Sequence, residues 1–412
     1  MAFAASGSGS TLKKAAHDKD GGESARRSRI LSSKLYFDVH TSKVPLIYSS
    51  SYDIAFLGIE KLHPFDSSKW GRICRFLIAE GFLDKNHVIE PLEAKREDLL
   101  VLKSGFRGMK RSGVVCVSAV WRRRGGARRR DEIGSSDGAE DWRQCTVPLL
   151  FCSLSLCLTE KQVHSESYLD SLKSSLTVST IVEVPPVAFL PNWLVDRFVG
   201  GTILAAKLAK ERGWAINIGG GFHHCSAENG GGFCAYADIS LCIYFAFIRF
   251  NISRVMIIDL DAHQGNGYEK DFCDDRRVYI LDVYNPDIYP FDYEARRCIN
   301  QKVEIVSGTT TNEYLSKLDG ALEVAADAFD PELIIYNAGT DILDGDPLGR
   351  LKISPDGIAT RDEKVFMFAR ERAIPLVMLT SGGYMKSSAK VIADSIINLS
   401  KKSLITLESI QK

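Results

Sequence analysis

The feature that most constrains this chain is an apolar run that leads straight into three side chains able to bind a metal. The run spans residues 255–258, and Asp259, Asp261 and His263 follow it at alternate positions. Alternate side chains of an extended chain share a face, so the three can converge at the end of a strand. The alternative is a buried strand that ends in a solvated acidic turn, but burying this pattern without a cation is costly. The run therefore predicts a metal site at the open end of a parallel strand.

Three further apolar runs also end in small residues, followed by side chains with acid–base chemistry. The run at 214–218 leads through three glycines to the adjacent pair His223 and His224. Adjacent histidines on a regular strand face opposite sides, whereas in a glycine-rich loop both can face one cavity. The other two runs lead to Asp341 and Tyr384. Alone, an Asp there would more often cap a helix and a Tyr would more often pack in a core, so only the four segments together make them site candidates.

Together these residues predict hydrolysis of an amide without a covalent intermediate. Asp261, His263 and Asp341 would be three metal ligands, which leaves a position for a water that the cation acidifies. One histidine of the pair would accept a proton from that water, and either could protonate the leaving amine. Tyr384 would donate to the oxyanion. No Gly-Lys-Ser/Thr follows the glycine-rich runs, which argues against a phosphate-binding Walker A loop.

At these segments the sequence resembles the zinc-dependent histone deacetylases. The motifs at 219–224, 259–267 and 337–343 are most similar to the class IV branch of that family. The resemblance covers residues 44–101 and 163–398. It implies a three-layer arginase/deacetylase-like α/β fold with a mostly parallel central sheet, helices on both faces, and the site at the carboxyl ends of the strands. It also implies hydrolysis of N6-acyl-lysine, acetyl or long-chain fatty acyl, on histones or other proteins.

The resemblance also implies a role for particular residues. The catalytic set would be His223, His224 and Tyr384, and the Zn²⁺ ligands would be Asp261, His263 and Asp341. A supporting set, with a structural K⁺, would be Asp259, Asn266 and Asp282. Gly232 and Phe233 would line the acyl-lysine tunnel, with Tyr289 or Phe291 on the opposite wall. The implied partners are acyl-lysine peptides such as histone tails and a corepressor complex, without sequence-specific DNA binding or a membrane, in the nucleus or the cytoplasm.

Asn266 departs from the better-known class I pattern, in which an acid at this position pairs with the second histidine. A neutral partner stabilises an imidazolium less than a carboxylate does. We therefore expect His224 to be the more readily neutral histidine of the pair. A pH–rate profile of Asn266→Asp with an unshifted alkaline limb would count against this expectation.

Other functions remain open beside the acyl-lysine hydrolase. An arginase-like ureohydrolase needs further carboxylates after the Asp-Ala-His run, and the sequence has none there. An acetylpolyamine hydrolase is harder to exclude. A non-catalytic scaffold is the third alternative, because residues 102–162 interrupt the family pattern and the stretch 189–202, which contributes to the tunnel rim, looks shorter than in the family. Metal content and turnover separate the scaffold from an enzyme.

The rest of the chain fits an α/β domain with additions. Apolar runs at 45–49, 214–218, 255–260, 278–283, 333–337 and 375–381 alternate with helical patterns at 202–212, 313–328 and 387–400. This alternation predicts a parallel sheet with helices on both faces. We expect a disordered tail over 1–40, a discontinuous catalytic domain over 41–101 and 163–400, and a C-terminal tail over 401–412.

Residues 102–162 interrupt the family pattern and carry 12 Lys and Arg against 6 Asp and Glu. We interpret them as a translated intron. The run at 147–158 is rich in Leu, Phe, Ser and Cys, which have pyrimidine-rich codons, and Gln162 after it can be encoded by CAG. A pyrimidine tract followed by AG is the pattern at the end of an intron. A basic loop that binds acidic partners is the alternative. The ten cysteines are irregularly spaced without a Cys-x-x-Cys pair, which favours idle thiols over a disulfide framework. No run is long and apolar enough to cross a membrane.

Overall fold

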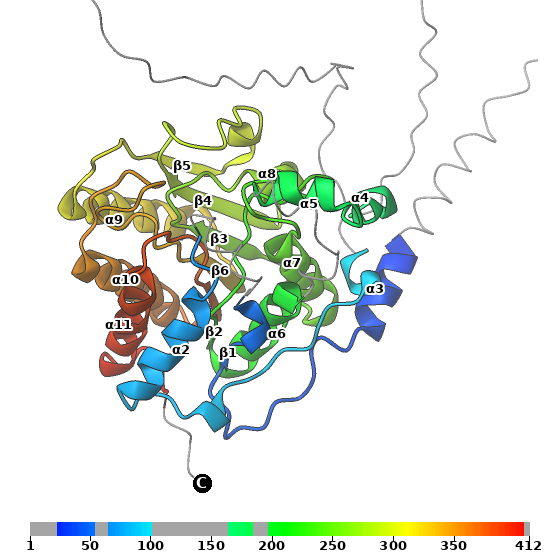
Figure 1. Cartoon of the computed structure of the whole chain (residues 1–412), viewed down its shortest axis with the longest axis horizontal. Coiled ribbons are helices and arrows are strands. Elements are labelled where there is room, and N and C mark those ends of the chain that lie inside the picture. Colours follow the sequence, from blue (N-terminus) through cyan, green and yellow to red (C-terminus); the bar gives the residue numbers. More distant parts are fainter. Residues whose placement is uncertain (1–22, 54–64, 101–163, 184–196, 408–412) are drawn as a thin grey trace, which may run out of the picture. The chain divides into compact units, whose positions relative to one another are not determined.

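The sheet at the centre of the molecule is parallel throughout. The computed structural model describes residues 23–53, 65–100, 164–183 and 197–407. In this part of the chain, seven strands pair in the order β1-β2-β7-β6-β3-β4-β5, and every pair is parallel (Figure 1). The strands are β1 (Leu46–Ile47), β2 (Trp214–Asn217), β3 (Val255–Asp259), β4 (Val278–Tyr284), β5 (Gln301–Glu304), β6 (Leu333–Asn337) and β7 (Leu376–Leu379).

The strands form where the apolar runs predict them, because most of the sheet is covered on both faces. Every residue of β2, β3, β6 and β7 is buried. A parallel strand with two covered faces reads as a continuous apolar run rather than as an alternating one. The edge strand β5 was not predicted, since its residues alternate between half-buried and exposed and include no apolar run.

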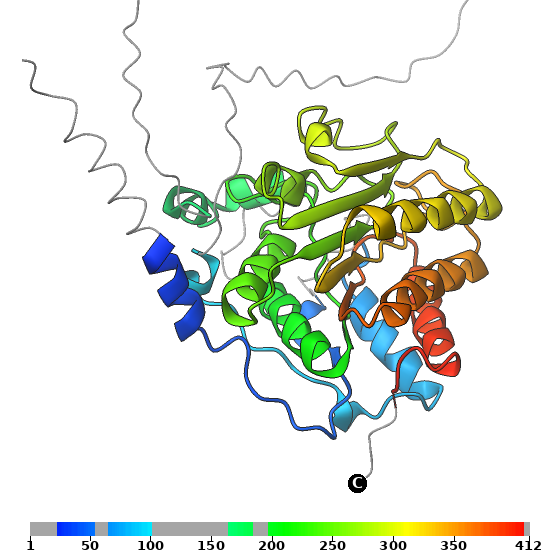
Figure 2. The same ribbon diagram turned by 180° about the vertical axis from the view of Figure 1, so that it is seen from behind.

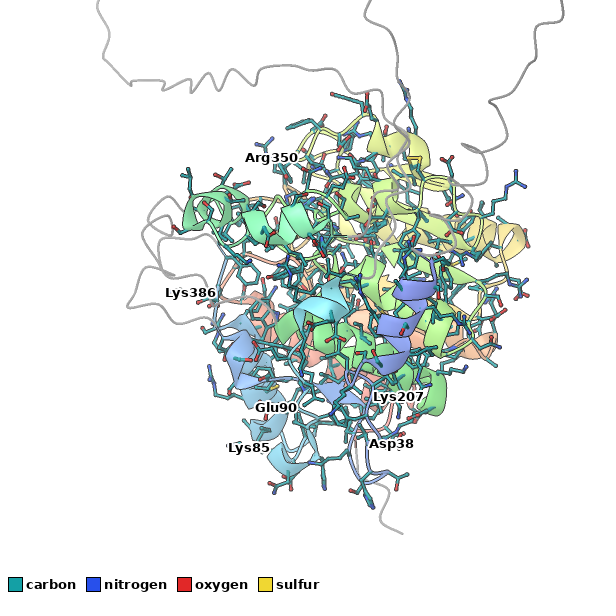
Figure 3. All side chains as sticks on the ribbon, turned by 90° about the vertical axis from the view of Figure 1, so that its right-hand side faces the viewer. Asp38, Lys85, Glu90, Lys207, Arg350 and Lys386 are labelled. Atoms are coloured by element: carbon teal, nitrogen blue, oxygen red, sulfur yellow. A yellow bond between two sulfur atoms is a disulfide. The ribbon has the colours of Figure 1, made fainter. Side chains whose placement is uncertain are left out.

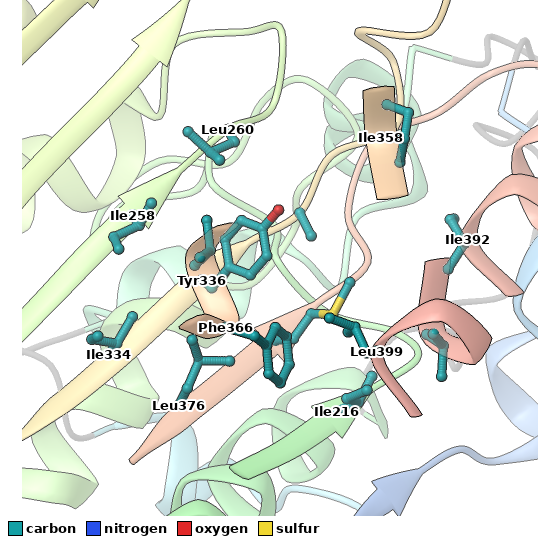
Figure 4. Close-up of a cluster of buried hydrophobic side chains, with 14 of the residues drawn as sticks. Ile216, Ile258, Leu260, Ile334, Tyr336, Ile358, Phe366, Leu376, Ile392 and Leu399 are labelled. Atoms are coloured by element: carbon teal, nitrogen blue, oxygen red, sulfur yellow. The ribbon is translucent and has the colours of Figure 1, made fainter. Parts of the chain in front are cut away.

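Two helical layers cover the sheet, as predicted. One face carries α6 (Arg197–Arg212) and α7 (Asp238–Arg249), and the other carries α2 (Lys69–Ala79), α9 (Thr311–Ala328), α10 (Pro355–Glu371) and α11 (Ser388–Lys401) (Figures 1 and 2). Successive residues of β3 belong to different layers. Ile258 packs in the cluster that includes Tyr336, Phe366 and Leu376 (Figure 4), whereas Ile257 packs in the cluster under α6 and α7.

Shorter helical segments connect these layers. They are η1 (Ser50–Tyr52), η3 (Lys85–His87), α3 (Arg96–Leu99), α4 (Glu166–Ser171), α5 (Ser175–Ile181), α8 (Asn266–Asp271) and η5 (Ala295–Cys298). Local sequence explains where the long helices begin. A capping box of Thr310 and Glu313 begins α9, and Ser354 accepts from the backbone N–H of Gly357 at the start of α10.

The tail predicted to be disordered over 1–40 is ordered from residue 23 onward. Residues 23–32 are helical and Ile30 is fully buried. Further on, the ammonium of Lys207 on α6 lies 3.2 Å from the carboxylate of Asp38, and the two side chains are neighbours in Figure 3. The prediction failed because the apolar contacts that hold this segment come from distant parts of the chain. Residues 1–22, 102–162 and 189–196 lie outside the described residues, so the expectations for them stay predictions.

One cysteine pair contradicts the prediction of idle thiols. Cys273 and Cys298 form a disulfide, with Sγ atoms 1.99 Å apart and a sequence separation of 25 residues. The fold brings the chain after α8 against η5, a proximity that cysteine spacing does not reveal. The other cysteines of the described residues are free and buried, as predicted. In the same residues, no helix is long and apolar enough to span a membrane.

Candidate active site

Four strand ends gather the predicted site residues at one edge of the sheet. The strands β2, β7, β6 and β3 are neighbours, and each leads into one of the four segments singled out from the sequence. Asp259 and Asn337 are the last residues of β3 and β6 and lie opposite each other in register. The carboxyl ends of parallel strands are where α/β folds place their ligands.

Asp261, His263 and Asp341 form a buried cluster whose candidate ligand atoms all lie within 4.8 Å of one another. The His263 Nδ1 atom lies 2.8 Å from the Asp341 Oδ2 atom and 3.1 Å from the Asp261 Oδ1 atom. Burial alone would lower the pKa of His263, but the two carboxylates raise it to about 10. Burial, followed by the charge of Asp261, raises the pKa of Asp341 to about 7. Two close buried carboxylates beside an imidazole make a donor set that fits a divalent cation.

Backbone groups fix the orientation of both carboxylates. The backbone N–H of Ala262 donates to Asp341 Oδ1 at 2.9 Å. The backbone N–H of Gly382 donates to Asp261 Oδ2 at 3.0 Å, and the hydroxyl of Ser381 donates to the same oxygen at 3.2 Å. The cluster is therefore held in place by the loops that follow the strands.

His223 is paired with a carboxylate. Its Nδ1 atom lies 2.9 Å from the Asp259 Oδ2 atom. Asp259 also accepts from the Tyr268 hydroxyl at 2.9 Å and from the Asn337 amide at 3.1 Å. Burial opposes the charged form of His223, but the carboxylates of Asp259 and Asp261 raise its pKa to about 9. This histidine is thus arranged to hold a proton.

His224 has the opposite electrostatic surroundings, although its ring centre is only 4.2 Å from that of His223. Its Nδ1 atom lies 2.9 Å from the Asn266 Oδ1 atom. Burial, and then the charges of His223 and His263, lower its pKa well below the ordinary value. These directions agree with the expectation that His224 is the more readily neutral histidine. Burial is the main cause, however, because the hydrogen bond to Asn266 acts in the opposite direction.

Aromatic rings from separate loops surround these groups. The ring centre of Tyr384 lies 6.2 Å from that of His263 and 6.1 Å from that of Phe233. The ring centre of Tyr289 lies 4.8 Å from that of His224. The residues predicted to line a tunnel therefore lie beside the predicted catalytic side chains, whereas Phe291 is half exposed at 51%.

Gly232 occupies a position that has room only for glycine. Its φ is +51°, and an added Cβ atom would lie 2.4 Å from His224 Cδ2. We expect Gly232→Ala to lower the free energy of unfolding by about 1–3 kcal/mol from overpacking, on top of about 1–2 kcal/mol for the left-handed backbone. Gly308→Ala is the matched control, because its φ is +85° and nothing lies within 4 Å of an added Cβ. Equal losses in denaturant unfolding of the two variants would contradict a close approach to His224.

Sequence reasoning missed Lys69, a fully buried lysine under the cluster. Its ammonium donates to the backbone carbonyls of Ser381 at 2.5 Å and Gly382 at 2.8 Å. Burial lowers its pKa to about 8, against the opposing effect of Asp341 and Asp261. The signal was present, since Lys69 lies four and eight residues before apolar residues 73 and 77 on the buried face of α2.

Asp282, predicted to support a potassium ion, is fully buried near two other acids. Its Oδ2 atom accepts from the backbone N–H of Gly265 at 2.9 Å. When both carboxyls are ionised, its Oδ1 atom and the Oε1 atom of buried Glu269 have no hydrogen-bond partner among the described residues, whereas a protonated Asp282 would donate to Glu269. Burial, and then the charges of Asp259 and Glu269, raise the pKa of Asp282 well above the ordinary value. Unpartnered buried carboxylate oxygens fit a cation that prefers oxygen ligands.

Comparison with known proteins gives concordant results. Residues 158–399 match the family model described as "Histone deacetylase domain". The protein called Histone deacetylase 2 of Arabidopsis thaliana is 63% identical over 391 residues, which cover 93% of this chain and 85% of that protein. Histone deacetylase 8 of Xenopus tropicalis is 28% identical over 196 residues, which cover 45% of this chain and 52% of that protein.

A solved structure of an HDAC homologue complexed with SAHA has the same fold. It superposes with a TM-score of 0.58 at 21% sequence identity, over 88% of this chain and 84% of that chain. With the parallel sheet and its two helical layers, this match confirms the predicted arginase/deacetylase-like fold.

Proposed function

The chain belongs to the histone deacetylase family and is a deacetylase enzyme, and from this membership we propose that it hydrolyses N6-acyl-lysine with the help of zinc. The observation that carries the proposal is the buried cluster of Asp261, His263 and Asp341 beside two histidines with opposite electrostatic surroundings. Histone tails and other acylated proteins are the proposed substrates, in the nucleus or the cytoplasm, and a corepressor complex is a proposed partner.

Zinc is the proposed metal because the resemblance to the zinc-dependent deacetylases implies it, and because three protein donors that leave a position open are the pattern of catalytic zinc sites. When bound by Asp261, His263 and Asp341, it would supply the Lewis acidity that polarises the acyl carbonyl and acidifies a water. We propose a structural K⁺ beside Asp259 and Asp282, supported by the unpartnered Asp282 oxygen.

The chain's own residues would move the protons. His224, whose pKa is lowered, would be neutral and accept a proton on its unbonded ring nitrogen. His223, whose Nδ1 atom pairs with Asp259, would donate to the leaving amine. The Tyr384 phenol would donate a hydrogen bond to the oxyanion. Gly232, Phe233 and Tyr289 would enclose the acyl-lysine side chain and exclude water from it.

Hydrolysis of two peptides tests the proposal, one with acetyl-lysine and one with myristoyl-lysine. We expect a chelator to abolish turnover, zinc to restore it, and Tyr384→Phe to lower kcat by about 10²–10³ as loss of one oxyanion donor does. The ratio of the two rates would show the preferred acyl length, which would bear on the proposed class IV placement. Turnover of acetylpolyamines but of neither peptide would favour a small-molecule amidohydrolase. No zinc-dependent turnover of any of these substrates would favour a non-catalytic scaffold.

We also propose that residues 102–162 are dispensable for the catalytic domain. The two flanks contact each other directly, because Arg96 of α3 donates to the Asp170 carboxylate of α4 at 3.0 Å. A chain with Val101 joined to Val163 should therefore fold with an unchanged or higher midpoint of thermal unfolding and with equal or higher kcat/KM. A shift of the midpoint downward by more than a few degrees would show that the segment contributes to the fold. Sequencing the transcript tests whether the segment is a translated intron.

A further inference from the structure

A chain of polar side chains leads from His224 away from the metal cluster. The Nδ1 atom of His224 lies 2.9 Å from Asn266 Oδ1, and Asn266 Nδ2 donates to Asp292 Oδ2 at 3.1 Å. The ammonium of Lys270 pairs with the same Asp292 oxygen. His223 differs, since its Nδ1 atom meets the carboxylate of Asp259 directly. The Asn337 amide lies beside the same Nδ1 atom, but the acid there reaches the ring without it, whereas the Asn266 amide stands between the His224 ring and Asp292.

The amide at position 266 can be oriented in two ways, and the two have different consequences for His224. With Oδ1 toward the ring, the ring must donate from Nδ1, which leaves Nε2 with a lone pair. With Nδ2 toward the ring, Nδ1 must accept, so the neutral ring carries its proton on Nε2 and that atom cannot act as a base. A carboxylate at 266 could only accept and would need no such orientation.

Asp292 selects between these orientations. Although burial opposes it, the ammonium of Lys270 holds the pKa of Asp292 below its ordinary value. An ionised carboxylate can only accept hydrogen bonds, so it takes the Nδ2 end of Asn266 and turns Oδ1 toward His224. Its two oxygens have separate partners, because Oδ1 accepts from the backbone N–H of Ala295 at 3.1 Å.

Several contacts connect α8, which carries Asn266 and Lys270, to the segment that carries Asp292. Asn266 and Lys270 lie one turn apart on α8, and Asp292 lies three residues before η5. The side-chain amide of Gln264 donates to the backbone carbonyl of Asp292 at 3.2 Å. The disulfide between residues 273 and 298 links the end of α8 to η5. Asp292 is therefore held at a fixed distance from Asn266.

We propose that Asp292 is a positioning residue that orients the Asn266 amide and thereby keeps the proton of neutral His224 on Nδ1, leaving Nε2 as the base. This inference rests on the proposed function for its effect on catalysis, but the orientation itself does not depend on turnover. It adds to the site an acid that does not touch the His224 ring and that lies 26 residues from Asn266 in the sequence.

Asp292→Asn is the most informative change, because it keeps the shape and retains an oxygen to accept from Ala295. Because the Lys270 ammonium would hold the amide oxygen on the side of Asn266, the change and all its comparisons are made in a Lys270→Met background. There the new amide keeps its oxygen toward Ala295 and presents a donor to the Asn266 Nδ2 donor, which favours the flipped Asn266. We expect kcat on an acyl-lysine peptide to fall about 10–100-fold, in the range of a lost supporting partner at a metal site, with KM changed less than about threefold.

The background of Asn266→Asp separates orientation from a general structural role. A carboxylate at 266 accepts in either orientation, and the amide that Asp292→Asn introduces can donate to it. Asp292→Asn should therefore cost less than about threefold in kcat in this background, although the same change is costly when Asn266 is kept. Equal fold-losses in both backgrounds would overturn the proposal. Lys270→Met by itself removes the ion pair but not the Asn266 bond, and a loss equal to the one that Asp292→Asn adds would also overturn it.

A spectroscopic measurement on the full chain, with and without zinc, does not require activity. With ¹⁵N-labelled histidine, the signals of His224, identified by their loss in His224→Gln, should show the proton on Nδ1 in Lys270→Met and on Nε2 when Asp292→Asn is added to it. The same tautomer in both would overturn the proposal. The expected switch in a chain without turnover would support the positioning role while the proposed function fails.

Discussion

Asp341→Asn should abolish zinc binding and lower acyl-lysine hydrolysis by about 10³-fold or more, since the metal contributes several kcal/mol to the barrier. The change keeps the shape of the side chain and the oxygen that accepts from Ala262. It removes one of the two charges that attract a divalent cation. Zinc content of the purified variant and its kcat/KM are the measurements, with exposed Asp344→Asn as the control in the same segment.

The same variant should stabilise the metal-free protein by an amount that grows with pH and is complete above about pH 7. Burial and the charge of Asp261 raise the pKa of Asp341 from 3.8 to about 7. A raised carboxyl pKa contributes stability that is present below the unfolded value and lost as the pH rises through the folded value. The unaltered metal-free chain should therefore lose stability relative to Asp341→Asn between pH 4 and pH 7. The measurement is the free energy of unfolding of both proteins against pH, with a chelator present. The same pH dependence in both would contradict the repulsion between Asp341 and Asp261.

His224→Gln should lower kcat by about 10²–10⁴, the usual contribution of a general base, while zinc content stays unchanged. Burial and two neighbouring imidazoles hold the pKa of His224 well below its ordinary value, so the ring is a proton acceptor. Glutamine can replace its hydrogen bond to Asn266 but cannot take a proton. The measurement is kcat on an acyl-lysine peptide together with metal content.

Two variants control for this result. His40→Gln changes an exposed histidine and should retain full activity. His223→Gln changes the partner of Asp259 and should mainly affect protonation of the leaving amine. If His224→Gln retained activity within about fivefold and His223→Gln lost it, the role of base would belong to His223.

Much of the sheet and of the candidate site could be predicted from local patterns. The strands β2, β3, β6 and β7 are continuous apolar runs because both of their faces are buried. Their carboxyl ends meet at one edge, so side chains that follow such runs converge even when they are distant in sequence. The helix α7 was not predicted, because it is buried nearly all around and lacks a polar face to show the helical period.

The sequence by itself determined which side chains follow the strands, and through them the family and the candidate metal ligands. Only the tertiary structure decided which residues form hydrogen bonds with those side chains and with the loops that carry them. Lys69 reaches the carbonyl of Ser381 from 312 residues away, and Asp292 reaches Asn266 from a loop beyond another strand. Such contacts follow no period along the chain. They arise because burial leaves each polar group in need of a partner, and only the packed fold determines which partner is near.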